Sequence, residues 1–429
     1  MSLSTNAAHA REEVVFWHFW GGADRPVVER IVEGFNASQD RYRVRAIAMP
    51  GANLDLKFFL SVAGGSPPDV MNQDDPVVAD WAHRGLLASL EEMASAEELE
   101  RLEGWLFPAA RRLGSFDGRL YALCNGLDIR ALYCNQTLLA EHGLSPPRTL
   151  EELDRIAETI APHHAEGDRT RMGYLPDPRR LWAWGAAFGG SFYDSDAEDV
   201  EAMITADSPR VLDALRWMGG YADRYGPSAL ARFRSGEQAL TGASFTLLNN
   251  RRYAVQMDGQ WRLRDVAAVR ARAAERGEAC DEITVVPLPR PAGGVANAGW
   301  VNGNFFVVPH NARSKDGAWA FMKYWAGFGN EAAAGEACAA GGWIPASERV
   351  VASEAYQAAI EREPLLRVFV DLAASEYQQP VPPLPVASHY YQEVIGAAQD
   401  VLYRGADPDE SLRGAAERVR RRLRGVMQR

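Results

Sequence analysis

The stretch that decides the fold is LYALCNGLDIRALYCNQTLLAEHGLSPPRTLEEL, residues 120–153. Two strand-like runs, Leu120–Cys124 and Ile129–Asn135, are separated by Asn125-Gly126-Leu127-Asp128. Beyond the second run, Thr149 and Glu152 have the spacing of a capping box, which predicts a helix over Leu150–Ile160. We therefore expect two strands followed by a helix, with polar side chains in the segment between the strands.

Upstream of this stretch the chain alternates between strand and helix patterns. Val14–Trp17, Arg43–Met49 and Asp69–Met71 are strand-like. Between them lie a helix with Pro26 in its first turn and a second helix over Leu54–Ala63. Strands that alternate with helices in this way predict a parallel sheet with right-handed crossovers.

Downstream, mixed strand and helix patterns resume and continue to the end of the chain. Ser208-Pro209 has the pattern of a helix start. The other predicted elements are strands at Tyr253–Met257, Glu282–Val286 and Asn304–Val308, a helix capped by Ser314, and final helices at 390–403 and 409–423. Since 429 residues exceed a comfortable size for one core, two α/β domains are expected.

Composition excludes several classes of function. No apolar run approaches the roughly 20 residues of a membrane span. A net charge of −11 argues against nucleic acid or an anionic membrane as partner, and the basic run Arg418–Arg424 suits the end of a helix. The four cysteines have no metal or redox spacing, so we expect buried free thiols, with a Cys124–Cys134 disulfide as the alternative.

The sequence contains no motif that indicates catalysis or a cofactor. The nucleophile elbow, phosphate loop, zinc-binding helix and dinucleotide fingerprint are all missing. Asp74 and Asp75 are adjacent, so they point in different directions and cannot flank one glycosidic bond by themselves. We therefore expect no enzymatic activity, no cofactor and no metal.

Tryptophans and acidic or amide side chains follow the ends of the predicted strands instead. Open α/β sheets bind ligands at this edge. An indole offers a stiff apolar platform for the C–H face of a sugar ring, and carboxylates make strong hydrogen bonds to its hydroxyls. The predicted ligand-binding residues are Trp17, His18, Trp20, Asn72, Asp74, Asp75, Asn125, Asp128, Trp182, Trp184, Asp258, Trp261, Trp300, Asn302 and Trp343.

Several segments taken in order resemble the bacterial extracellular solute-binding proteins of family 1, the sugar-binding components of ABC importers, which include maltose-binding protein. The matching segments are VVFWHFWGG (14–22), GGSPPDVMNQDD (64–75), the stretch 120–153, YAVQMDGQW (253–261), GNFFVVPHNARSKDGAWAFMKYW (303–325) and GGWIPASERV (341–350). Carried over by position, Asp128 matches a sugar-binding acid and Trp261 a stacking aromatic. Cys134 replaces the tyrosine usual before Asn135, and Cys124 replaces a proline, which puts the local geometry in doubt.

The resemblance implies an α/β periplasmic-binding-protein fold of type II, with two lobes that are each a mostly parallel sheet flanked by helices. The expected N-terminal lobe is residues 12–126 and 304–343, and the C-terminal lobe is 127–303 and 344–429, with hinge crossovers between them. Residues 1–11 are expected to be a disordered N-terminal segment ahead of a mature chain whose signal peptide has been removed.

The resemblance also implies a periplasmic or otherwise extracytoplasmic monomer that binds a sugar and docks on ABC permease subunits. A polyol, an amino sugar or a phosphate ester is the alternative ligand, and a carbohydrate-active hydrolase is the less favoured alternative class. The pairing of indoles with carboxylates disfavours an anionic ligand.

Overall fold

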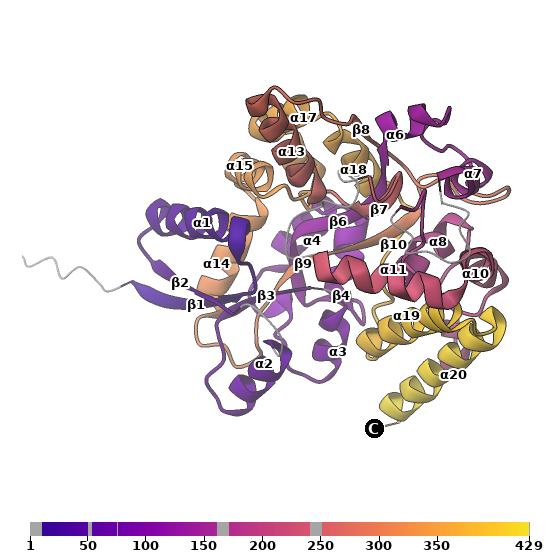
Figure 1. Ribbon diagram of the computed structural model, residues 1–429. Coiled ribbons are helices and arrows are strands. Elements are labelled where there is room, and N and C mark those ends of the chain that lie inside the picture. Colours follow the sequence, from indigo (N-terminus) through magenta and orange to yellow (C-terminus); the bar gives the residue numbers. More distant parts are fainter. Residues whose placement is uncertain (1–10, 50–53, 75, 161–170, 241–250, 429) are drawn as a thin grey trace, which may run out of the picture.

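The computed structural model describes residues 11–49, 54–74, 76–160, 171–240 and 251–428 (Figure 1). Its strands are β1 (Glu12–His18), β2 (Tyr42–Ala48), β3 (Val70–Asp74), β4 (Ser115–Phe116), β5 (Arg119–Leu120), β6 (Ala122–Asn135), β7 (Val255–Gly259), β8 (Ile283–Val286), β9 (Gly299–Val307) and β10 (Gln378–Gln379). None of the helices within these ranges is both long and apolar enough to cross a membrane.

The helices cover the sheet and fill both ends of the molecule. They are α1 (Arg25–Ser38), α2 (Leu54–Ala63), α3 (Val77–His83), α4 (Ala96–Trp105), α5 (Pro108–Gly114), α6 (Gln136–Glu141), α7 (Leu150–Ile160), α8 (Leu181–Ala187), α9 (Val200–Met203), α10 (Pro209–Tyr225), α11 (Pro227–Leu240), α13 (Arg262–Arg276), α14 (Lys315–Ala326), α15 (Glu331–Gly341), α16 (Glu348–Val351), α17 (Glu354–Arg362), α18 (Leu366–Ala373), α19 (Ala387–Arg404) and α20 (Pro408–Met427).

One sheet runs through the whole molecule in the order β2-β1-β3-β9-β6-β7, with β8 paired to β6 and β10 paired to β9. The pairs β1–β2 and β1–β3 are parallel, as the strand–helix alternation predicted. The pairs that involve β6 and β9 with β3, β7 or each other are antiparallel. Strand β9 pairs with β3 and β10, and β6 pairs with β9, β7 and β8. Together β9 and β6 therefore connect the part that carries β1–β3 to the part that carries β7, β8 and β10.

Strand β6 corrects one sequence prediction. Asn125–Asp128 was expected to separate two strands, but β6 is continuous over Ala122–Asn135 and shifts register only between Cys124 and Gly126. The neighbouring β9 supplies partners to the backbone through this segment, so a turn is not needed and the irregularity absorbs one residue. Cys124 and Cys134 therefore lie on the same strand, and they do not form the alternative disulfide with each other.

Strand β9 corrects a second prediction. A strand was expected only from Asn304 to Val308, yet the observed strand begins at Gly299, so Trp300 and Asn302 lie inside it and not in a turn before it. A Cβ atom on Gly303 would stand 2.6 Å from the carbonyl oxygen of Gly126, and one on Gly299 would stand 3.0 Å from the Gln378 side chain. The glycines are needed for the close approach of neighbouring strands and not for a turn.

Several helix predictions are confirmed to the residue. Helix α7 begins where the capping box places it, since Glu152 N donates to Thr149 Oγ1 and Thr149 N donates to the Glu152 carboxylate, both at 3.3 Å. Helix α2 has the predicted bounds, and α10 begins at Pro209 after Ser208. Phe16 of β1 packs edge-on against Phe321 and Trp325 of α14, and Phe306 of β9 packs edge-on against Trp325, so these rings are part of the core beneath β1 and β9.

Candidate functional site

The register of β3, β9 and β6 places polar residues from three strands on one face of the sheet. Asp128 of β6 pairs with Asn302 of β9, and Asp74 of β3 pairs with Asn304 of β9. Because alternate residues of a strand point to the same face, this face carries side chains from both halves of the molecule. We use the name crossing-strand site for these side chains together with the neighbouring side chains from β7, from α19 and from the residues just before α8 and α13 that lie around them. Its residues are Asp74, Asp128, Arg130, Arg180, Asp258, Trp261, Trp300, Asn302, Asn304 and Tyr391.

Arg130 is the centre of this site. Its guanidinium carbon lies 4.4 Å from the ring centroid of Trp300 and 4.9 Å from that of Trp261, so both indoles make cation–π contacts with one cation. The side chain is buried and donates hydrogen bonds to the backbone carbonyl of Asp128 and the amide oxygen of Asn302. Burial, together with the nearby Arg180, lowers the pKa of Arg130 to about 10.

Arg180 approaches the same indole from the end of the short 3₁₀ turn Pro178–Arg180 before α8. Its guanidinium carbon lies 5.8 Å from the Trp300 centroid, and a terminal nitrogen lies 3.6 Å from a carboxylate oxygen of Asp258. Asp258 also accepts a hydrogen bond of 2.9 Å from Arg262 at the start of α13. Asp258 is thus shared between two arginines and is buried at the end of β7.

Asp128 of β6 is held by the side chain of a neighbouring glutamine. Gln260, which is buried, donates to Asp128 Oδ1 at 3.0 Å and to the Leu127 carbonyl at 3.0 Å, and its own oxygen accepts from Ile129 N. Gln260 therefore fixes both the backbone of β6 and the orientation of Asp128. Burial raises the pKa of Asp128, against the lowering effect of Arg130.

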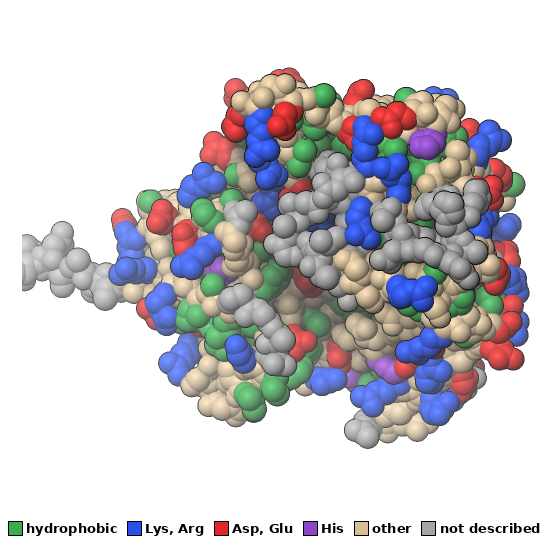
Figure 2. Space-filling view, viewed as in Figure 1, with side chains coloured by type: hydrophobic (Ala, Val, Ile, Leu, Met, Phe, Trp, Pro, Cys, Tyr) green, Lys and Arg blue, Asp and Glu red, His purple; other side chains and the backbone are tan. Residues whose placement is uncertain are grey.

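Asp74 is exposed to solvent, yet its pKa is raised to about 7, first because surrounding protein desolvates it and then because Asp128 lies nearby. A side chain that water reaches and that protein still surrounds lies in a concave surface. Figure 2 shows the molecule hollowed between the part that carries α1 and α2 and the part that carries α11 and α19. Asp74 therefore faces a recess in the surface, and Asp128 lies close to it.

An aromatic wall continues from Trp300 through α19 to α8. The rings of Trp300 and Tyr391 lie 5.7 Å apart, and Tyr391 stacks on Trp182 at 6.2 Å. Trp182 itself is only 1% exposed and packs at 4.2 Å against Phe192. Trp182 is therefore part of the wall behind Tyr391, and Tyr391 separates it from Trp300.

The aromatic residues of the first loop form a separate cluster. Trp20 stacks on Trp325 at 5.2 Å and lies 5.6 Å from Trp343, while His18 stacks on Phe16. Burial lowers the pKa of His18 to about 4, so the ring is neutral at physiological pH. No ring contact within the described ranges joins this cluster to Trp261 or Trp300. Trp17, on the same strand β1, is half-buried.

The remaining predicted residues are interior or fall outside the description. Trp184 is fully buried and donates a hydrogen bond of 3.1 Å to Tyr174 Oη. Asn72 donates to Asn125 Oδ1 at 2.9 Å, and both side chains are buried between β3 and β6. Asp75 lies outside the described residues.

Six of the predicted residues belong to the crossing-strand site: Asp74, Asp128, Asp258, Trp261, Trp300 and Asn302. The prediction missed Arg130, Arg180, Asn304 and Tyr391, as well as Gln260, which holds Asp128 in place. Arg130 lies in the predicted strand Ile129–Asn135, two residues after Asp128. A strand extended back to Asp128, as observed, puts both side chains on one face, so the spacing could have indicated Arg130. Arg180 had no such signal, because its position depends on the packing of α8 against the sheet.

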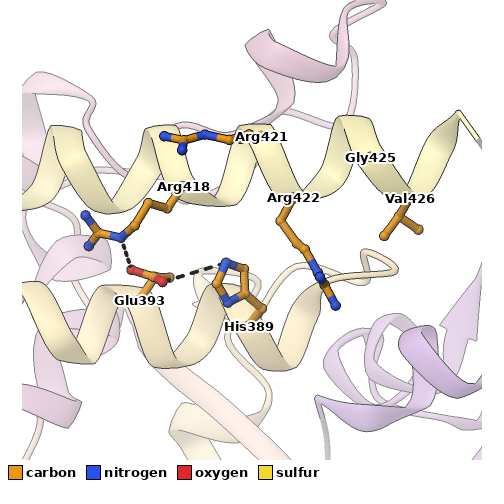
Figure 3. A pocket seen from close by; sticks show the side chains of 7 residues that line it. All are labelled: His389, Glu393, Arg418, Arg421, Arg422, Gly425 and Val426. Carbon is orange, nitrogen blue, oxygen red and sulfur yellow. Dashed lines mark hydrogen bonds and ion pairs between the residues drawn. The ribbon is translucent and has the colours of Figure 1, made fainter.

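A hollow on the far end of the second half lies between α19 and α20 (Figure 3). Its Arg418 donates to Glu393 at 2.6 Å, and His389 lies 3.7 Å from the same carboxylate. The basic run of the sequence is thus partly neutralised by α19. In the part of the chain that the structure describes, no cluster of three or more His, Cys, Asp or Glu side chains could hold a metal ion.

A sheet that spans two halves through crossing strands is the architecture of two-lobed α/β binding proteins. The chain belongs to the bacterial extracellular solute-binding proteins, whose family model matches residues 30–364. No curated protein is detectably similar in sequence.

Solved structures with the same fold include the CpMnBP1 protein with mannotriose bound, which is 20% identical, has a TM-score of 0.76 and covers 95% of this chain and 99% of its own. The GacH receptor of Streptomyces glaucescens GLA.O, solved unliganded and with acarbose, is 20% identical with a TM-score of 0.74 and coverages of 96% and 99%. The sugar-binding protein MalE of Xanthomonas citri is 19% identical with a TM-score of 0.74 and coverages of 96% and 98%.

Proposed function

We propose that the chain is the sugar-binding component of an ABC importer, and that it holds a mono- or oligosaccharide at the crossing-strand site. The observation that carries the proposal is the meeting of the partly exposed Trp261, the buried Trp300 beneath it and Asp128 on one face of the sheet. Indole faces and fixed carboxylates are the two groups that a sugar ring needs. The structural relatives, whose names refer to bound oligosaccharides or to sugar binding, support this assignment.

Closure of two lobes would complete the site. The proposed lobes are residues 12–126 with 304–343, and 127–303 with 344–429. The three crossings lie together, since Leu127 pairs with Gly303 and its N–H donates to the Ile344 carbonyl at 2.8 Å. A sugar that contacts both lobes favours the closed form by the difference between its affinities for the two forms.

The proposal includes binding without turnover, an extracytoplasmic location and a monomer that docks on permease subunits. It must be distinguished from glycoside hydrolysis, because a carboxyl group of raised pKa opposite a second carboxylate is also the arrangement of a general acid and its partner. Asp74 and Asp128 have this relation.

Thermal unfolding in the presence of mono- and oligosaccharides tests the proposal. A sugar at about 100 times its dissociation constant should stabilise the protein by roughly 2.7 kcal/mol. Chromatography of the same sugars after hours of incubation should return them unchanged. If none of the carbohydrates stabilises the protein, or if shorter sugars are released, the proposal is wrong.

A further inference from the structure

The crossing-strand site contains buried hydrogen-bond donors that lack acceptors. The Nε atoms of Arg130 and Arg180 and the indole nitrogen of Trp300 are buried and have no hydrogen-bond partner among the described residues. All three belong to side chains that contact one another through the Trp300 ring. Because a buried donor without an acceptor is costly, a ligand that fills this site should bring acceptor atoms.

The charge of Arg130 also lacks a partner in contact. Its two acceptors are a backbone carbonyl and an amide oxygen, which are both neutral. Within the described part of the chain no carboxylate lies within ion-pair distance of its guanidinium. The nearby Asp128 accepts a hydrogen bond from Gln260, and Asp258 pairs with Arg180 and Arg262. A guanidinium that is buried without a contacting anion is unfavourable, and an anionic ligand group relieves it.

Sugar hydroxyl groups accept hydrogen bonds, but each one also brings a donor that needs an acceptor of its own. An ionised carboxylate only accepts, and its two oxygens match the planar fork of a guanidinium. It therefore satisfies both the surplus of donors and the positive charge of Arg130.

We infer that the sugar bound at the crossing-strand site carries a carboxylate, as a uronic acid or an oligosaccharide containing one, and that Arg130 binds that group. The inference rests on the proposed function and specifies its substrate class. It reverses the expectation, made from the sequence alone, that the site disfavours anions.

The acidic side chains that face the same recess must be compatible with an anion. Asp74 is faced by Asp128 and Arg130 of β6 and by Asp55 of α2. Its pKa of about 7 means that it is largely protonated at pH 6, where it can donate a hydrogen bond to a carboxylate oxygen. A uronate should therefore bind more tightly at pH 6 than at pH 8. A phosphate ester, with up to two negative charges, is less well matched to a single contact-free guanidinium.

Isothermal titration with ligands of matched rings tests the inference. The probes are glucose, glucuronate and glucose 6-phosphate, galactose and galacturonate, mannose and mannuronate, and short oligosaccharides of each, at pH 6 and pH 8. At least one uronate should bind about tenfold or more tightly than its neutral parent. Arg130→Gln should abolish this preference, whereas Arg130→Lys, which keeps the charge, should retain part of it. Arg367→Gln, on the exposed ion pair with Asp371, is the matched control and should change nothing.

Thermal unfolding of each variant comes first, so that affinities are compared only between folded proteins, and Arg130→Lys decides if Arg130→Gln does not fold. Equal or tighter binding of the neutral parents, a preference for the phosphate ester, or an acid preference that survives in Arg130→Gln would overturn the inference and leave the proposed function standing. Binding of no sugar, acidic or neutral, would overturn both.

Discussion

The position of Trp261 depends on the glycine two residues before it, and Gly259→Ala should displace the indole. A Cβ atom on Gly259 would lie 2.1 Å from Cζ3 and 2.2 Å from Cη2 of the Trp261 ring. Ordinary contacts between carbon atoms are about 3.5–4.0 Å, so the ring must move by about 1.4 Å. The φ angle of Gly259 is not in the left-handed region, so alanine fits the backbone and the change tests the ring contact alone.

The magnitude follows from what the ring loses. Forcing an extra methyl group into a packed contact costs about 1–3 kcal/mol. Trp261 is half-exposed and can swing outward, which favours the lower end of that range. Movement away from Arg130 also weakens a cation–π contact that contributes about 0.5–2 kcal/mol. We expect Gly259→Ala to lower the free energy of unfolding by about 1–2 kcal/mol and to weaken sugar binding about tenfold or more.

Chemical denaturation measures the first quantity and isothermal titration the second. Gly220→Ala is the matched control, because a Cβ atom there meets nothing within 4 Å and alanine is favoured in the middle of α10. It should be neutral or stabilising by up to about 1 kcal/mol. If Gly259→Ala is as stable as the original protein and binds sugar equally well, the assigned position and role of Trp261 are wrong.

Three further predictions concern the same region. Trp261→Ala should abolish sugar binding while the far-ultraviolet circular dichroism stays unchanged, and an unaltered affinity in titration would refute the platform role. The pKa of Asp74 in the folded protein, about 7, is above its unfolded value of 3.8, so its contribution to stability is fully present below about pH 4 and is lost as pH rises through 7. The melting temperature, measured relative to that of Asp74→Asn, should therefore fall between pH 4 and pH 8. A difference that stays constant over this range would contradict the prediction. Gly303→Ala places a methyl group 2.6 Å from the Gly126 carbonyl oxygen and should destabilise the strand crossing by about 1–3 kcal/mol in denaturation, unlike Gly396→Ala in α19, where a Cβ meets nothing within 4 Å.

The parts of the fold that local chemistry controls could be predicted from the sequence. The capping box of Thr149 and Glu152 and the apolar pattern of Leu54–Ala63 each depend on residues within one helix, and both gave correct helix bounds. The β6 segment could not be predicted in this way. Asn125 and Gly126 are typical of a turn, and only pairing with a strand some 175 residues later in the chain keeps them extended.

The residues of the candidate site also fall into those that local sequence could predict and those that depend on tertiary packing. Indoles and carboxylates could be selected by residue type, and several of them do meet on the sheet face. The cation between the indoles could not, because arginine is common on surfaces and its burial depends on β7, β9 and α8 packing around β6. The ionic character of the site is thus a tertiary property, and it changes the expected ligand.

Strand β6 also relates the site to the proposed hinge. Leu127 contacts the other two crossings, Asp128 and Arg130 are the next side chains on the site face, and Gln260 hydrogen bonds across residues 127–129. A ligand that moves Arg130 or Asp128 therefore acts on backbone within three residues of the crossing. This segment is short and hydrogen-bonded to β9, so it is rigid and a movement at one end also moves the other. We therefore expect ligand contact and lobe closure to be strongly coupled. Gln260→Leu removes the hydrogen bonds to residues 127–129 but keeps the volume of the side chain. It should reduce the free energy of sugar binding by more than it reduces the free energy of unfolding, which the melting temperature reports. Equal effects on both would mean that Gln260 only supports the fold.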